Sequence, residues 1–125
     1  MLLKDNLYHI IDSEKAGDTN SYTLRVLDTY PPLKGHFPGS PVLPGVCILQ
    51  MFKELAETEL AIGKPLGYSE IKQCKFLLPI AMEKSIDLMA SITLKQDGEC
   101  WSLSGTLKSA EAIFTTLKAV LTTKQ

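Results

Sequence analysis

The sequence has few cysteines, no excess of basic charge and little histidine. Its three cysteines, Cys47, Cys74 and Cys100, are odd in number and widely spaced, which excludes a disulfide framework or a zinc pattern. We expect all three to be reduced and packed against apolar neighbours. The formal net charge is -1 at pH 7, without the clustered basic excess that binding of a phosphate backbone requires. Nucleic acid is therefore not an expected partner.

A long uninterrupted apolar run is also missing. The longest apolar stretch, from Val42 to Phe52, is broken by Pro44 and Gln50 and falls short of the ~20 residues that span a bilayer. The N-terminus lacks the apolar core of a signal peptide. We therefore expect a soluble, cytoplasmic protein that does not enter a membrane.

What is present is an ordinary globular composition. The chain has 125 residues, of which 45% are hydrophobic and 22% are charged. This length suits one domain over residues 1–125, with a core large enough to fold without a metal or disulfides. The sequence contains neither a repeat nor a linker that would divide it.

Six strands are expected, and those from Ser21, from Ser85 and from Trp101 show alternating apolar and polar residues. Their expected positions are Tyr8–Asp12, a strand from Ser21 that ends at Tyr30, Ile71–Leu78, Ser85–Leu94, Trp101–Leu107 and Ala112–Leu121. The polar stretch from Ser13 to Asp18 and the triplet Gln96–Gly98 have the composition of turns. Strands spaced by roughly ten residues and joined by hairpin turns are typical of an antiparallel sheet.

One long helix is expected from Pro44 to about Ile62. Proline suits the first turn of a helix, and Gly63 is a stop signal. Residues 46–52 are apolar nearly all round the helix, so we expect this half to be buried. A sheet with one buried helix gives the fold class α+β.

The segment before this helix is rich in proline and glycine and contains His36. A high density of proline and glycine predicts a loop of defined shape that leads into the helix. The first turn of a helix leaves backbone N–H groups unpaired and carries a partial positive charge, and Gly45 has no side chain to block approach. An imidazole beside such a turn can act as a base next to a carbonyl-binding site. The alternative is that His36 only caps a turn.

Residues 35–46 read G-H-F-P-G-S-P-V-L-P-G-V. This run resembles the signature of the hotdog dehydratases of fatty-acid synthesis, the FabZ and FabA type, at every fixed position. The order of predicted strands and helix resembles that family over nearly the whole chain. Lys75 and Phe76, followed by Pro79, resemble the family's strand after the helix.

The resemblance implies a hotdog fold, a curled antiparallel sheet wrapped around one long central helix. It implies loss of water from a (3R)-3-hydroxyacyl thioester, carried by acyl carrier protein or CoA, to give a trans-2-enoyl thioester. Such chemistry would serve synthesis of a fatty acid, polyketide or aryl polyene. His36 would remove the C2 proton, and the Gly45 N–H would polarise the thioester carbonyl.

The resemblance also implies an assembly and a set of binding residues. Two subunits would pair through their sheets, and a hexamer built as a trimer of dimers is the larger assembly that the resemblance allows. Pro44 and Val46 flank the carbonyl site, and Phe37 and Phe76 would line an apolar tunnel for the acyl chain, with core packing as the alternative. Neither a metal nor a cofactor is implied.

The match breaks at Gln50, where the family carries an acidic residue that helps the C3 hydroxyl leave and that comes from the partner subunit. A glutamine amide donates hydrogen bonds but does not give up a proton. General acid catalysis contributes ~10²–10⁴-fold, so this change bears directly on activity. Gln50 is interpreted as a site residue, because an amide among apolar residues needs a partner.

Glu54 follows Gln50 by one helical turn, so both lie on one face. In the FabZ-type run E-A-M-A-Q, glutamine stands where this chain has Glu54, as if the two residues had traded places. One hypothesis makes Glu54 a displaced acid that acts through a water. The interpretation favoured by the sequence is a solvated helix glutamate beside Lys53.

Three functions remain open from the sequence. The first is an active dehydratase. The second is an impaired hotdog subunit that binds acyl thioesters or completes a heteromeric dehydratase with an active homologue. The third is a thioesterase of the same fold, although the run from Gly35 to Val46 is not typical of thioesterases.

Overall fold

The computed structural model describes residues 2–30 and 41–124. Within these ranges the chain forms six strands and one helix. The strands are β1 (Tyr8–Ala16), β2 (Thr19–Val26), β3 (Leu66–Phe76), β4 (Ile86–Asp97), β5 (Cys100–Lys108) and β6 (Ile113–Thr123), and the helix is α2 (Gly45–Leu60).

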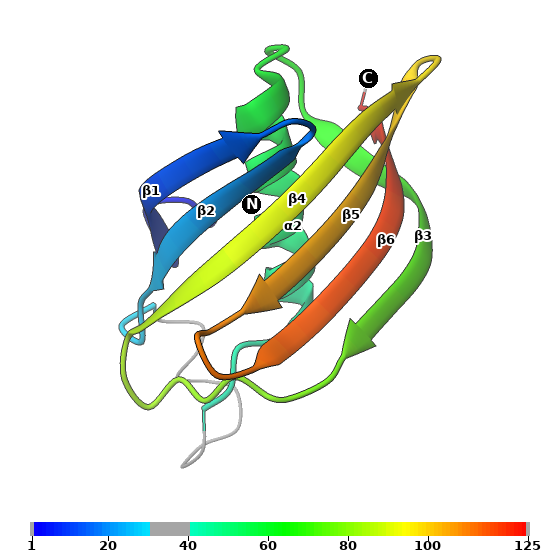
Figure 1. Cartoon of the computed structure of the whole chain (residues 1–125). Coiled ribbons are helices and arrows are strands. Elements are labelled where there is room, and N and C mark those ends of the chain that lie inside the picture. Colours follow the sequence, from blue (N-terminus) through cyan, green and yellow to red (C-terminus); the bar gives the residue numbers. More distant parts are fainter. Residues whose placement is uncertain (1, 31–40, 125) are drawn as a thin grey trace.

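The strands form a single antiparallel sheet in the order β1-β2-β4-β5-β6-β3. The sheet curls around α2, which lies along its concave face (Figure 1). β1 and β3 are the two edge strands, and each pairs with one neighbour in the described part of the chain. The predicted α+β class, with a curled sheet around one long central helix, is confirmed.

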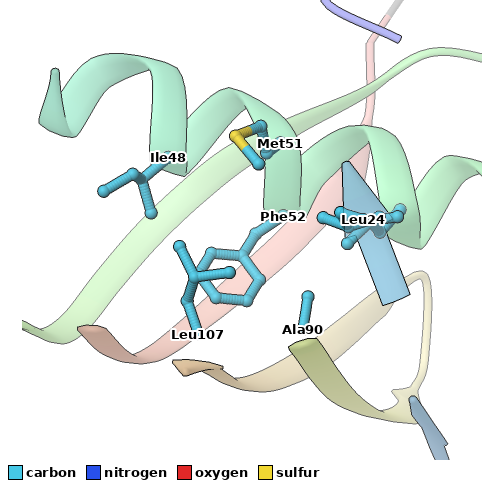
Figure 2. A pocket seen from close by; sticks show the side chains of 7 residues that line it. Leu24, Ile48, Met51, Phe52, Ala90 and Leu107 are labelled. Carbon is cyan, nitrogen blue, oxygen red and sulfur yellow. The ribbon is translucent and has the colours of Figure 1, made fainter. Parts of the chain in front are cut away.

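The core lies between α2 and the concave face of the sheet. Phe52, which is 1% exposed, projects from the helix toward Ala90 and Leu107 of the strands (Figure 2). A Cβ added to Gly105 of β5 would lie 2.7 Å from Cε1 of Phe52, so the absence of a side chain there lets the ring sit directly against the strand. The helix is thereby held at a fixed depth in the sheet.

The alternation predicted for β2, β4 and β5 is confirmed, whereas several boundaries differ. Tyr22, Leu24 and Val26 of β2 are buried, as are Leu88 and its inward-facing neighbours on β4. β1 does not end at Asp12 but continues to Ala16, and the turn follows at Gly17 and Asp18. The polar residues of this stretch belong to a solvent-exposed part of an edge strand, which does not need apolar side chains.

The helix begins at Gly45, one residue after the predicted Pro44, and ends at Leu60, before the predicted end near Ile62. Pro44 is the residue before its first turn, and Ala61 ends it in a left-handed conformation, with φ of 49° and an N–H that donates to the Glu57 carbonyl. The expectation that residues 46–52 are buried all round is wrong at Val46, which is 70% exposed. A helix that lies on one sheet buries only the side that faces the sheet.

The described helix is too short and too polar to cross a membrane.

Candidate functional site

The segment that leads into α2 is fastened to the segment that follows β3. Val42 and Ala81 form an antiparallel bridge. The Leu43 N–H donates to the Ile80 carbonyl over 2.9 Å, and the Met82 N–H donates to the Pro41 carbonyl over 2.8 Å. These bonds fix where the helix starts relative to the end of β3.

Between the two fastened segments lies a hollow of about 420 Å³, which we call the helix-start hollow. Its walls come from both segments and from the first turns of α2. The lining residues are Val42, Leu43, Gly45, Ile48, Phe76, Leu78, Pro79 and Ile80. Most of these side chains are apolar, so the hollow suits an apolar chain.

Gly45 and Phe76 meet at this hollow. A Cβ on Gly45 would lie 2.8 Å from Cζ of Phe76, which is closer than two non-bonded carbon atoms normally approach. The glycine therefore lets the aromatic ring rest against the helix backbone. Phe76 and Leu78 are 52% and 49% exposed, so they wall the hollow and are not part of the core.

The first turn of α2 presents backbone donors at the same place. Pro44 stands before the helix with φ −64° and ψ 145°, and no side chain in the described part of the chain caps the turn. The Cys47 and Ile48 N–H groups donate to the Pro44 carbonyl. Gly45 and Val46 are the first helical residues, whose amides have no acceptor within the helix. With the helix dipole, this turn favours a carbonyl oxygen that gains negative charge.

Gln50 lies at a different hollow of about 420 Å³, which we call the helix-side hollow. Its lining residues are Val46, Leu49, Gln50, Lys53, Gly67, Tyr68 and Lys124. The structure thus brings Gly45, Ile48 and Phe76 together, and it places Gln50 on another side of the same helix. Within one described chain, Gly45 and Gln50 do not line a common hollow, whereas Val46, the second residue of the helix, lines the helix-side hollow beside Gln50.

Glu54 is buried, with 3% of its surface exposed, so the interpretation as a solvated glutamate is wrong. Its Oε2 accepts from the Leu3 N–H and from Gln50 Nε2, each over 2.8 Å. Its Oε1 accepts from the Lys4 N–H over 2.8 Å and from the Tyr8 hydroxyl over 3.0 Å. The N-terminal segment covers this part of the helix, which the sequence pattern of α2 alone does not reveal.

Four donors on two oxygens match the capacity of an ionised carboxylate. Lys53, the lysine expected beside Glu54, instead has its Nζ 3.7 Å from Glu57 Oε2. The geometry favours Glu54 as a hydrogen-bond acceptor. The hypothesis of a displaced acid stays a prediction that this arrangement does not support.

His36 and Phe37 lie outside the described residues, so their predicted roles remain predictions. Cys47 is buried at the start of α2, and burial raises the pKa of its thiol, in keeping with a packing role. Cys74 and Cys100 are also free thiols. In the described ranges, no three His, Cys, Asp or Glu side chains gather closely enough to hold a metal ion.

Two tyrosines near the helix were missed by the sequence reasoning. Tyr8 donates to Glu54, and the Tyr68 hydroxyl donates to the Leu49 carbonyl over 2.6 Å. Burial raises the pKa of both hydroxyls above the usual range, and the negative charge of Glu54 adds to this at Tyr8. A tyrosine on an inward-facing strand position was the available signal, since a buried hydroxyl needs a partner.

Comparison with protein families gives a match over most of the chain. A family model described as ApeI dehydratase, of the ApeI-like family, matches residues 12–114. A curated relative from Paramagnetospirillum magneticum, named 3-hydroxyacyl-[acyl-carrier-protein] dehydratase FabZ, is 26% identical over 114 residues. The alignment covers 86% of this chain and 68% of that relative.

Solved structures agree on the fold. The dehydratase heterocomplex ApeI:P from Xenorhabdus doucetiae contains a chain with 25% identity and a TM-score of 0.72, covering 91% of this chain and 96% of that one. A mutant of the fluoroacetyl-CoA-specific thioesterase FlK has a TM-score of 0.69 but 10% identity, and 90% of each chain is covered. This second likeness shows the hotdog fold and nothing more.

The buried Tyr8–Glu54 pair predicts a loss of stability in alkali. Because the pKa of Tyr8 is raised in the folded protein, its contribution is complete below the unfolded value of about 10 and is lost as the pH rises above it. The free energy of unfolding should fall by up to about 1.4 kcal/mol per pH unit from this group. Urea unfolding of wild type and Tyr8→Phe between pH 7 and 11 tests this.

Tyr8→Phe should cost about 1–3 kcal/mol at pH 7, because it removes a donor from a buried carboxylate. The difference between the two proteins should shrink as the pH rises. A difference that stays constant to pH 11 would contradict the assignment.

Proposed function

The chain belongs to the ApeI-like dehydratase family, and from that premise we propose that it removes water from a (3R)-3-hydroxyacyl thioester to give the trans-2-enoyl thioester. The proposed substrate is carried by acyl carrier protein, as the name of the FabZ relative states for that protein, or by CoA. The observation that carries the proposal is the apolar helix-start hollow, which opens on the first turn of α2 beside Gly45.

In this proposal the thioester carbonyl accepts a hydrogen bond from the Gly45 N–H. Negative charge that develops on this oxygen as the C2 proton leaves is stabilised by the amide and the helix dipole. His36 takes the C2 proton, the C2–C3 double bond forms and the C3–O bond breaks. The acyl chain lies against Phe76 in the helix-start hollow, with Phe37 and Pro44 assigned to the same part of the substrate site. Val46, which lines the helix-side hollow, is assigned to the part of the site that a second subunit completes.

The hydroxyl leaves as water only if it receives a proton. The Gln50 amide does not supply one, and Glu54 is already an acceptor for four donors. The proton must therefore come from the His36 imidazolium that removal of the C2 proton creates, or from an acidic residue of a second chain. The two sources correspond to an active homodimer and to a heteromer with an acid-bearing homologue.

A second subunit is supported by the exposed apolar side chains around the start of α2. Val46 is 70% exposed, and Phe76, Leu77 and Leu78 are each about half exposed. β3 is an edge strand whose outer side is unpaired within the described chain, and Ile71 on it is 44% exposed. Such features mark surfaces that associate. We propose pairing through β3 as a homodimer or heterodimer, with a hexamer as a larger form.

The separation of the two hollows supports a site shared between subunits. Gly45 lines one hollow and Gln50 lines the other, as is needed if the position of Gln50 serves the carbonyl-binding turn of a neighbour.

We place the protein in the cytoplasm, since its three cysteines are free thiols and a reducing compartment keeps thiols in that state.

A heteromeric dehydratase is the second candidate. Two observations favour it: the amide at the acid position is bonded to a buried carboxylate, and a structure 25% identical to this chain is a dehydratase heterocomplex. In this form the chain supplies His36 and the Gly45 amide, and a homologue supplies the acid.

Replacement of His36 tests the reaction. Purified protein with 3-hydroxyacyl carrier protein should form the enoyl product, and His36→Ala should lower kcat/KM by about 10²–10⁴-fold because the base is lost. Product is followed by mass spectrometry, which also detects free acid. Release of free acid in place of enoyl product would favour thioester hydrolysis, and activity unchanged in His36→Ala would contradict the proposal.

Mixing tests the heteromer. If the acid comes from a second chain, a homologue with glutamate at the Gln50 position, itself carrying His→Ala at its own base, should restore turnover when mixed with this protein. The gain over the sum of the separate proteins should be about 10²-fold or more. A mixture that equals the sum of its parts contradicts the heteromer.

Gly45→Ala tests the hollow. The added methyl would lie 2.8 Å from the Phe76 ring and displace it, so kcat/KM should fall by about tenfold to a hundredfold. Phe76→Leu in the same protein should recover most of the loss, and Phe76→Leu alone serves as control. Failure of the second change to recover activity would show that the ring contact is not the cause.

A further inference from the structure

The N-terminal residues form a compact hook against the middle of α2. We use the name N-terminal hook for residues 3–8. Inside the hook, the Leu7 N–H donates to the Leu3 carbonyl and the Asp5 N–H to the Tyr8 carbonyl, each over 2.7 Å. Leu3, Leu7 and Tyr8 are completely buried. The hook is therefore an ordered part of the fold.

Glu54 joins this hook to Gln50. Two backbone N–H groups and one hydroxyl of the hook occupy three positions on the carboxylate, and Gln50 Nε2 occupies the fourth over 2.8 Å. A carboxylate cannot donate, so the amide must turn its nitrogen toward Glu54. The bond thus selects one of the two orientations of the Gln50 amide.

We propose that Glu54 is a positioning residue: its buried carboxylate, held by the N-terminal hook, fixes the Gln50 carboxamide at the site. The role of Gln50 in that site rests on the proposed function. Glu54 itself does not touch the substrate. The order of the amide depends on residues about fifty positions earlier in the chain, which present the carboxylate to it.

If Glu54 positions Gln50, an acid introduced at position 50 lies directly beside the Glu54 carboxylate. In Gln50→Glu the new carboxyl would face Glu54 at about the distance that now separates Gln50 Nε2 from Oε2, 2.8 Å. Two carboxyl groups this close share a proton. Because Glu54 keeps its three donors from the hook, the pKa of the introduced carboxyl is the one that rises. Exchanging both residues, Gln50→Glu with Glu54→Gln, keeps one carboxylate and one carboxamide. The two carboxyl groups then no longer face each other, and the rise in pKa is removed.

The first test observes the Gln50 amide directly. In nitrogen-15 NMR spectra its side-chain signals are identified by their loss in Gln50→Ala. Glu54→Gln should speed hydrogen exchange of this amide by roughly tenfold or more, because a hydrogen bond to a charged group is lost. The matched control is Glu59→Gln: Glu59 is on the same helix and accepts from Tyr22 over 2.7 Å.

Glu59→Gln should leave the exchange of the Gln50 amide unchanged. If it has the same effect as Glu54→Gln, or if neither variant has an effect, the positioning role is wrong. Tyr8→Phe should also speed exchange of the Gln50 amide, but by less, because it removes one of the hydrogen bonds that hold the Glu54 carboxylate.

The second test does not require Glu54→Gln to fold. The carboxyl introduced by Gln50→Glu is titrated by carbon-13 NMR and compared with the one introduced by Gln96→Glu, at an exposed position near the end of β4. The former should titrate at least one pH unit above the latter, a tenfold shift in the proton equilibrium. Where the double variant folds, the shift should disappear in it. Equal titration at both positions overturns the proposal.

Neither readout depends on turnover. A rigid, coupled Gln50 amide in a protein that lacks dehydratase activity both alone and when mixed with an acid-bearing homologue would keep the positioning role and reject the proposed function. Turnover with an amide indifferent to Glu54 would do the reverse.

Discussion

The packing of α2 into the concave face of the sheet is the constraint on which the remaining structure depends. Phe52 rests against Gly105 and Leu107, so the helix has one depth and one rotation relative to the strands. Once these are set, the position of the helix start is set too. The bridge between Val42 and Ala81 then fastens the preceding segment to the chain after β3, and the helix-start hollow is what remains between them.

Much of this architecture is predictable from the chain because it follows from local periodicity. Alternation in β2, β4 and β5 indicates which side chains face inward, and Pro44 marks the helix start. The order of strands does not follow from such patterns. β3 lies beside β6 and β2 beside β4 because the sheet curls round the helix, a non-local arrangement. For the same reason the exposure of Val46 was missed, since periodicity alone does not show which side of an apolar helix meets the sheet.

Glu54 shows where local reading fails at the site. On a helical wheel it belongs to the polar half of α2, and a neighbouring lysine offers a ready ion pair. Its true partners are supplied by the N-terminal hook, which covers that part of the helix and buries the carboxylate. Burial of a carboxylate is costly unless donors fill its oxygens. The hook supplies donors in the form of main-chain N–H groups. Nearly every residue carries such a group, so no sequence motif could have predicted these partners of Glu54.

The relation between Gln50 and Glu54 bears on how a dehydratase-type site can lose its acid without losing its structure. A carboxylate and a carboxamide one helical turn apart satisfy each other in either order, because one accepts where the other donates. The negative charge can therefore move by one turn while the hydrogen bond between the two positions survives. Here the charge sits on the inner position, where backbone donors stabilise it, and the outer position carries the neutral partner. Under the proposed function, the cost of the change falls on proton supply to the leaving hydroxyl, while the Glu54 carboxylate keeps its four hydrogen-bond donors.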